Sequence, residues 1–344
     1  MRHISLHQGY LVLSNLVNEN SELIRLVNQT LLSDLTSGNE KSVCLALSFI
    51  ANCGNAETAE ILANQVGKLM MDTSSSSFII KKSTLTLLHL FRKNPDAVQP
   101  DSWHDYIEGM LKGGDCGILT CMMALLNEFA AAEPDTFKDL MPVVCNLLEN
   151  ILRKENVASD YIYSGVPAPW LIVSGLRFLQ LYTETPSAEC TKQLSTVASL
   201  ILHSPATTFL STNRDRNVTA HSAALAVLFE CVAVAVAHRL TDGVIPLAIT
   251  HVRRLLACPL PDVRYTALGA MRQLAPLDPE HAGKDAKFVE LVMGMLYEAD
   301  VSIRRRVVDV LFECCSEANS KTMVEELLRY LPECDLDMKE ELVC

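Results

Sequence analysis

The stretches DVRYTALGAMRQLA (262–275) and DVSIRRRVVDVLF (300–312) begin in the same way. In each, an aspartate and a valine precede an arginine, and a small or branched residue then opens a stripe of apolar side chains. The residues that we align, Ala267 and Val307, are 40 positions apart (307 − 267). The two stretches therefore predict equivalent helices in successive repeats of one chain.

The second stretch fits an amphipathic helix. Its apolar residues Ile303, Val307, Val310 and Leu311 fall at i, i+4, i+7 and i+8, which places them on one face. Asp300 stands where a helix N-cap belongs, and Asp309 lies one turn after Arg305. The apolar face predicts a neighbouring surface against which the helix packs.

Three upstream stretches are built similarly, at 41–54, 79–96 and 117–135. Their small-residue anchors Ala46, Thr84 and Cys121 are 38 and 37 positions apart (84 − 46 and 121 − 84), and a period of about 40 is typical of HEAT or armadillo repeats. The partner helices that we expect within these repeats lie at 21–35, 102–112, 135–154, 190–202, 244–257 and 286–296. Turn-forming Pro, Gly, Asn and Asp punctuate the connections, and strand signals are nearly absent.

The period lengthens in the middle of the chain. The anchors Cys121, Ser174 and Ala226 are 53 and 52 positions apart (174 − 121 and 226 − 174), and the extra residues fall in predicted loops at 155–169, 182–189 and 207–217. The sequence as a whole predicts an all-α fold, a right-handed α-solenoid of about seven to eight HEAT/armadillo-like helical hairpins. We expect a single domain over 1–344, apparently truncated at both ends because neither end shows a polar capping repeat.

Composition narrows the class of protein. The 344 residues carry a formal net charge of −12, which disfavours binding to nucleic acid. No window of 18 uninterrupted apolar residues predicts a membrane span, and the N-terminus does not fit a secretory signal. The 12 cysteines contain no CxxC pair and mostly lie within apolar helical patterns, so we expect buried free thiols in a reducing, cytoplasmic setting.

Several segments resemble the large-chain trunk of the clathrin adaptors, and of the alpha-adaptins in particular. They are GYLVLSNLVNENSELIRLVNQTLLSDL (9–35), LALSFIANCGNAETAEILANQV (45–66) and YIYSGVPAPWLIVSGLRFLQLY (161–182), with VPAPWL at 166–171 favouring the alpha type. The two stretches that open this section continue the resemblance in the right order, so that it covers essentially the whole chain.

The resemblance implies a non-enzymatic scaffold, part of a heterotetramer with a beta-type large chain, a medium chain and a small chain. Such a complex links cargo and phosphoinositide membrane to clathrin at coated pits, on the cytosolic face of the plasma membrane. The family's N-terminal basic lipid site and its hinge and ear are not matched by any part of this sequence. No cargo or lipid residue is therefore carried over, and we expect weak binding to phosphoinositide membranes.

No catalytic or cofactor fingerprint appears, so we expect neither an enzyme nor a bound cofactor. The basic clusters are the candidate contacts for a partner or an anion, although a solvated helix face paired with nearby carboxylates is the more ordinary reading. They comprise Lys81, Lys82, Arg253, Arg254, Arg304, Arg305 and Arg306. The three consecutive arginines span about 200° of a helix, so at least one should face the neighbouring repeat. Trp170 is expected to be a packing anchor.

Two other functions fit the same fold. One is a generic armadillo-like module that binds a peptide or protein, and the other is the large chain of a different vesicle coat complex. The two tryptophans, at 103 and 170, do not form the regular ladder that peptide-binding grooves of this kind often display. Binding to a small adaptor chain separates the first alternative from an adaptor trunk.

Overall fold

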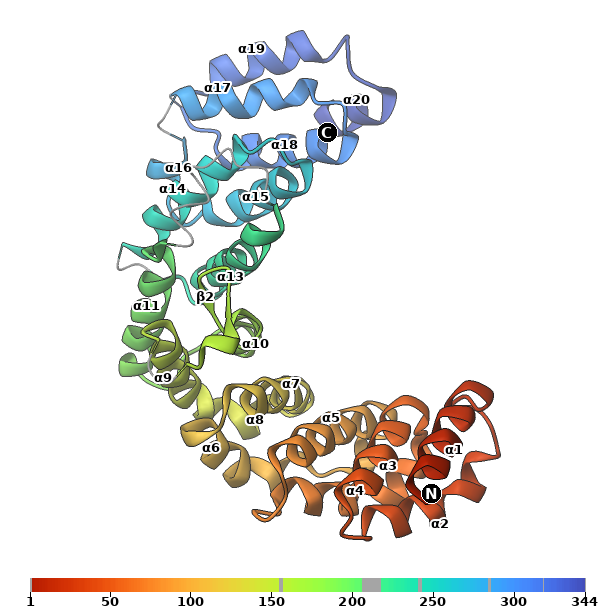
Figure 1. The fold of residues 1–344 in the computed structure, drawn as a ribbon. Helices are drawn as coiled ribbons and strands as arrows, with labels where there is room; N and C mark the ends of the chain where they lie inside the picture. The colour runs from red at the N-terminus through yellow and green to blue at the C-terminus, as the bar shows by residue number, and fades with distance from the viewer. Residues whose placement is uncertain are drawn as a thin grey trace. The chain divides into compact units, whose positions relative to one another are not determined.

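The computed structural model describes residues 2–154, 157–205, 218–240, 243–283, 286–317 and 319–343. Contacts between residues divide the chain into two compact units, Met1–Leu147 and Leu148–Cys344. Each unit is built from antiparallel helices in two layers (Figure 1). The all-α class is confirmed, whereas one continuous domain over 1–344 stays a prediction.

The first unit stacks hairpins of two helices. Its pairs are α2 with α3, α4 with α5, and α6 with α7; α1, α3, α5 and α7 follow one another in one layer, while α2 and α4 are neighbours in the other (Figure 1). The elements are α1 (Arg2–Leu16), α2 (Ile24–Leu35), α3 (Glu40–Cys53), α4 (Ala56–Met71), α5 (Ser77–Lys93), η1 (Pro95–Ala97), η2 (Pro100–Trp103), α6 (His104–Gly113), α7 (Cys116–Ala132), α8 (Pro134–Phe137) and η3 (Lys138–Leu140).

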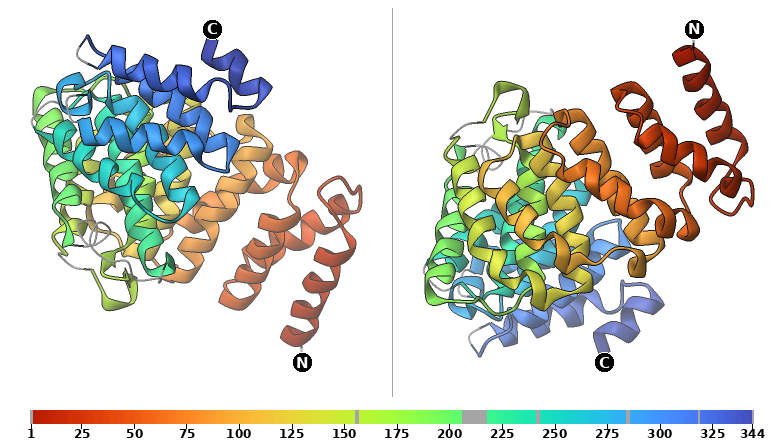
Figure 2. Two further views of the ribbon diagram at one scale, coloured as in Figure 1. Left: turned by 90° about the horizontal axis from the view of Figure 1, so that it is seen from above. Right: turned by 90° about the horizontal axis from the view of Figure 1, so that it is seen from below.

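The second unit repeats this arrangement with longer connections. The helices α10, α13, α15 and α18 follow one another in one layer, and the pairs α11 with α13, α14 with α15 and α17 with α18 join the two layers (Figures 1 and 2). The elements are α9 (Met141–Leu152), whose last turns belong here, η4 (Ser159–Tyr161), β1 (Ile162–Tyr163), β2 (Val166–Pro167), α10 (Pro169–Gln180), α11 (Ala188–Leu202), α13 (Val218–Ala237), α14 (Val244–Leu256), α15 (Pro261–Leu274), α16 (Pro279–Gly283), α17 (Ala286–Gly294), η5 (Met295–Tyr297), α18 (Val301–Glu313), α19 (Ser320–Tyr330) and α20 (Leu336–Val343).

Local sequence explains where many helices start. Side chains of Asn, Ser or Asp accept hydrogen bonds from free amides of the first turn, as the preference for these residues at N-caps requires. Asp300 accepts from the Ser302 amide at 2.8 Å, so its predicted cap is confirmed. The predicted apolar face of α18 is also confirmed, because its four residues are at most 3% exposed.

The core of the first unit is tightly packed. Phe129 on α7 is fully buried and meets Phe91 edge-on, with ring centroids 4.9 Å apart. Gly67 on α4 lies so close to Trp103 that a Cβ atom there would come within 2.1 Å of the indole ring. Small residues thus allow α4 to approach its neighbours, and burial of large apolar side chains stabilises the stack.

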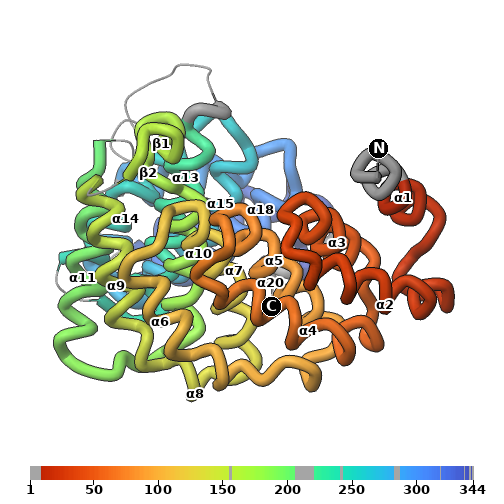
Figure 3. The backbone as a smooth tube through the Cα atoms, turned by 60° about the horizontal axis from the view of Figure 1, so that its bottom comes forward, coloured from red at the N-terminus to blue at the C-terminus, as the bar shows by residue number. Residues whose placement is uncertain are grey.

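Two features differ from the sequence predictions. The helix α4 was not among the expected partner helices, although it pairs with α5 across the layers. The predicted loop at 155–169 contains a two-stranded antiparallel hairpin, in which Ile162 pairs with Pro167 and Tyr163 with Val166 (Figure 3). Ser164 and Gly165 connect the strands with φ of 49° and 83°, as a tight hairpin turn demands. The predicted loop at 207–217 lies outside the described residues.

Candidate functional site

The lysines Lys81 and Lys82 on α5 contact neighbouring helices. The Lys81 ammonium pairs with Asp115, the N-cap of α7, at 3.1 Å. The Lys82 ammonium donates to the Ser48 hydroxyl of α3 at 2.6 Å and lies over the Phe78 ring. The two lysines therefore reach in opposite directions along the stack, and they do not converge on one anion.

The arginines Arg253 and Arg254 at the end of α14 differ in their surroundings. The Arg253 guanidinium donates to the His281 carbonyl at 3.3 Å and lies 4.4 Å from the centre of the Phe288 ring. Arg254 is exposed. Arg253 thus connects α14 to the following repeat.

The arginines of α18 diverge, as expected from their spacing. Arg304, with a side chain only 14% exposed, donates to Asp335 at 2.7 Å and to the Tyr330 hydroxyl at 3.3 Å. Arg306 lies over the Tyr265 ring on α15, on the opposite side along the stack. Arg305 is exposed. The triplet therefore links α18 to the repeats on both sides.

Asp309 also bonds outside its own helix. Its carboxylate lies 3.2 Å from Arg272 of α15 and 3.9 Å from Arg306. The sequence analysis placed it beside Arg305, one turn earlier. The structure adds a partner from the helix one repeat before, and the approach of Asp309 to Arg305 stays a prediction.

Ion pairs between successive repeats recur in both units. They join residues 31 to 37 positions apart in sequence (335 − 304 to 309 − 272), so that each side chain reaches the next hairpin or the turn that leads into it. The pairs are Arg25–Glu57, Lys81–Asp115, Arg92–Glu128, Arg264–Glu298, Arg272–Asp309 and Arg304–Asp335. Most are partly exposed, and such pairs contribute roughly 0–1 kcal/mol each. We therefore assign these ion pairs a role in aligning one hairpin with the next, and only a small contribution to the free energy of folding.

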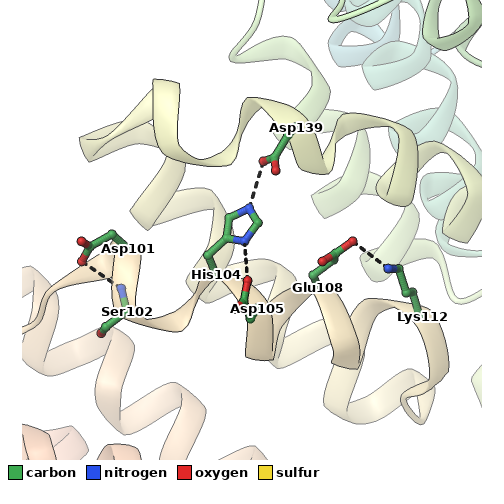
Figure 4. Close-up of polar contacts among 7 residues, drawn as sticks. All are labelled: Asp101, Ser102, His104, Asp105, Glu108, Lys112 and Asp139. Carbon is green, nitrogen blue, oxygen red and sulfur yellow. Dashed lines mark hydrogen bonds and ion pairs between the residues drawn. The ribbon is translucent and has the colours of Figure 1, made fainter.

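His104 makes a further bridge of this kind in the first unit (Figure 4). Its imidazole lies between Asp139, 2.9 Å from Nε2, and Asp105, 3.3 Å from Nδ1, and stacks on Phe137. The hydrogen bond to Asp139 raises the pKa of His104, and Asp105 adds to the effect against partial desolvation. The nearby Glu108 and Lys112 form a separate pair one turn apart at 2.7 Å. The histidine bridge joins α6 to η3 rather than forming an exposed reactive centre.

The hairpin presents aromatic side chains to solvent. Trp170, the second residue of α10, is 64% exposed and meets Tyr163 of β1 edge-on at 5.4 Å. The prediction that Trp170 is a packing anchor is therefore wrong. Ala168, between the hairpin and α10, has φ of 36°, and its amide donates to the Tyr161 carbonyl at 2.8 Å. Left-handed backbone at a non-glycine residue costs about 1–2 kcal/mol, so the surrounding hydrogen bonds hold the turn in place.

The remaining reactive groups sit apart from one another. Across the described ranges, no group of three or more His, Cys, Asp or Glu residues could hold a metal ion. Most described cysteines are buried, as predicted, and desolvation raises the pKa of Cys231 to about 12 and that of Cys314 to about 11. Thiols held neutral in this way are poor nucleophiles. Within the same ranges, no helix is long and apolar enough to cross a membrane.

Comparison with known proteins decides the family. Residues 7–344 match the family described as the adaptin N terminal region. The chain belongs to the adaptin family. It is 34% identical over 335 residues to AP-2 complex subunit alpha-1 of Arabidopsis thaliana, and 32% identical over 337 residues to AP-2 complex subunit alpha of Schizosaccharomyces pombe. These alignments cover 97% of this chain and 32% and 37% of the two relatives, so the adaptin chain spans about a third of their length.

Solved structures agree on the helical repeat fold. Importin beta superposes with a TM-score of 0.65 at 16% identity, over 96% of this chain and 40% of its own. A homology model of the full-length AP-3 complex gives a TM-score of 0.59 at 19% identity, over 97% of this chain and 52% of that one. At these identities the likeness shows the fold alone. The resemblance to alpha-adaptins is confirmed by the sequence relatives.

Proposed function

We propose that this adaptin chain is a non-enzymatic scaffold in a clathrin adaptor complex, acting in endocytosis and vesicle-mediated protein transport. The observation that carries the proposal is the match to the adaptin N terminal region along residues 7–344, together with 31–34% identity to alpha subunits of AP-2 complexes. The structure is compatible with it, because the basic side chains that could have formed a site mostly connect one repeat to the next.

The proposed partners are a small, a medium and a beta-type large adaptor chain in a heterotetramer, with cargo and clathrin engaged through the whole complex. The chain would act at the cytosolic face of the plasma membrane, in coated pits. A stack of hairpins suits this role because it presents a long surface whose shape is set by the contacts between repeats. Direct phosphoinositide binding by this chain should be weak, since its net charge of −12 opposes an anionic surface.

Co-expression with the small adaptor chain of the same complex tests the proposal. We expect the two chains to elute together in size-exclusion chromatography and to remain together through a second affinity step. A peptide receptor of similar fold should not retain the small chain. Separate elution, with solubility unchanged by co-expression, would overturn the scaffold role for this chain.

Membrane binding is tested separately, by liposome sedimentation at physiological salt. The wild type is compared with the variant Arg304→Gln, Arg305→Gln, Arg306→Gln on phosphoinositide vesicles. We expect equally weak binding by both proteins. Strong binding that the triple variant loses would instead make the α18 arginines a lipid contact.

A further inference from the structure

The second unit contains a large open cavity beside the β-hairpin, between α11 and α13. Its volume is about 1220 Å³, more than enclosed small-molecule sites usually have. The hairpin turn and β2 form one wall, α11 forms a second and the start of α13 a third. We refer to this cavity as the trough, defined by its lining residues on α9, the hairpin, α11 and α13.

Helix α11 gives the trough its length. Lys192, Ser195, Thr196, Ser199 and His203 all line it, and they follow one another at helical spacing along one stripe. At 1.5 Å per residue, the 11 positions from Lys192 to His203 (203 − 192) extend over about 16 Å. The trough is therefore elongated, with hydroxyl groups along its side and a basic residue at each end of the stripe.

The described residues that line the trough carry only basic titratable groups. They are Lys154, Lys192, His203 and His221, and none of the described lining residues is an aspartate or glutamate. This contrasts with the chain as a whole, which carries 41 acidic and 29 basic residues. The trough is thus complementary to an anionic ligand in a protein that is otherwise acidic.

The lining residues contributed by α9, the hairpin and α13 are called the apolar wall here, because they include Leu152, Val166, Pro167, Ala224 and Val227. Pro167 has no amide hydrogen, so β2 offers an incoming chain no donor at that position for strand addition. A ligand here would be held by side chains: apolar contacts on one wall, hydroxyl hydrogen bonds on the other, and basic groups at the ends.

We propose that the trough binds an extended acidic peptide segment of another protein. An extended chain rises about 3.3 Å per residue and its alternate side chains share one face, so carboxylates four residues apart lie on the same face about 13 Å apart. Through their flexible side chains they would meet Lys192 and His203 together. Alternate side chains between them would face the apolar wall, while peptide groups would meet the Ser and Thr hydroxyls. This inference goes beyond the scaffold role and does not depend on assembly with other adaptor chains.

The test uses the 344-residue chain and a fluorescein-labelled peptide, Gly-Glu-Val-Ser-Val-Glu-Gly-amide, followed by fluorescence anisotropy. The matched peptide replaces both Glu residues with Gln. We expect the acidic peptide to bind about tenfold more tightly, since each exposed ion pair contributes about 0.2–1 kcal/mol. Equal binding of the two peptides, or none by either, would overturn the proposal.

Protein variants locate the binding. Lys192→Glu should weaken binding of the acidic peptide about tenfold, because it removes one attraction and adds a repulsion. Lys68→Glu, on an exposed face of α4 outside the trough, makes the same change in net charge and should leave binding within about twofold. Equal weakening by both variants would mean only a general charge effect, and would contradict a site in the trough.

If the Lys192→Glu variant does not fold, two other measurements test whether the peptide binds in the trough. Ser199→Trp should fill the trough and abolish binding while the circular dichroism spectrum is retained. A photo-crosslinking residue at Thr196 should capture the acidic peptide. If it instead crosslinks a segment of this same chain, and the added peptide does not compete, the trough is an intramolecular contact and the proposal is wrong.

Discussion

The helices from α3 to α7 form a regular repeat region, whereas the segment from η4 to α10 is irregular. In the first, helices follow one another at close to the predicted period, and polar side chains such as Lys81 and Tyr106 bond across repeats. In the second, the period lengthens, a hairpin is inserted, Ala168 takes a left-handed backbone and Trp170 is exposed. In the regular region, side chains pack against neighbouring repeats. In the irregular region the additional residues form a surface, and this surface includes part of the trough.

The largest expected effect is a difference in unfolding free energy between two variants, one that loses a buried aromatic side chain of the regular region and one that loses an exposed aromatic side chain of the irregular region. Phe129→Ala removes a fully buried ring between Phe91 and Phe137, and should cost about 3–5 kcal/mol of unfolding free energy. Trp170→Ala should change it by no more than about 0.5 kcal/mol. Urea unfolding followed by circular dichroism measures both. Similar losses for the two variants would remove the distinction between the regions.

A smaller expected effect tests how closely α4 packs in the regular region. Gly67→Ala places a Cβ against the Trp103 ring and should cost about 1–3 kcal/mol, because the indole must move. Gly109→Ala on α6 is the matched control, since a Cβ there meets nothing within 4 Å. We expect the control to be neutral or to stabilise by up to about 1 kcal/mol. A neutral Gly67→Ala variant would show that α4 is more loosely packed than described.

A further, smaller effect is a pH dependence of opposite sign at two histidines, His104 in the first region and His238, which contacts α10 of the second. The bond to Asp139 raises the pKa of His104, so its contribution to stability is full below about pH 6.5 and is lost as the pH rises through the folded-state pKa. Burial lowers the pKa of His238, which contacts the Leu179 carbonyl of α10 at 2.8 Å. Its contribution is present above about pH 6.5 and is lost as the pH falls through the lowered pKa.

Unfolding of the wild type, His104→Gln and His238→Gln at about pH 5.5 and about pH 8 tests these signs. The destabilisation by His104→Gln should be larger at the lower pH. That by His238→Gln should be larger at the higher pH. If both variants shift stability in the same direction between the two conditions, the assigned environments are wrong.

The period and the helix caps of the fold could be predicted from sequence because they are local. Asp300 caps α18 and the stripe beginning at Ile303 is buried, both as expected. The helix α4 was missed because much of its buried face consists of small residues such as Ala59, Ala63 and Gly67, which give a weak apolar signal. Strands of two residues each are too short for any periodic pattern, so the hairpin was missed as well.

The surface properties could not be predicted from local patterns. Asp309 meets Arg272 because α15 and α18 pack side by side, and spacing within one helix does not show such a contact between repeats. Trp170 is exposed at the second position of α10, just after the left-handed residue Ala168, and the sequence pattern does not show that backbone geometry. The trough residues were also missed, although Ser195, Thr196 and Ser199 follow Lys192 at helical spacing, a hydroxyl-bearing stripe that the sequence does show.

Hydrogen exchange with peptide-level resolution tests most directly whether the regular repeats form the scaffold while the insertion stands outside it. Amides of α5, which packs against α3 and α7 on its two sides, should exchange slowest in the first unit. Amides from 159 to 166, in a short hairpin with an exposed turn, should exchange much faster than those of α10 and α13 in the second unit. Protection of the hairpin equal to that of α10 would contradict the account, because the insertion would then belong to the cooperative core.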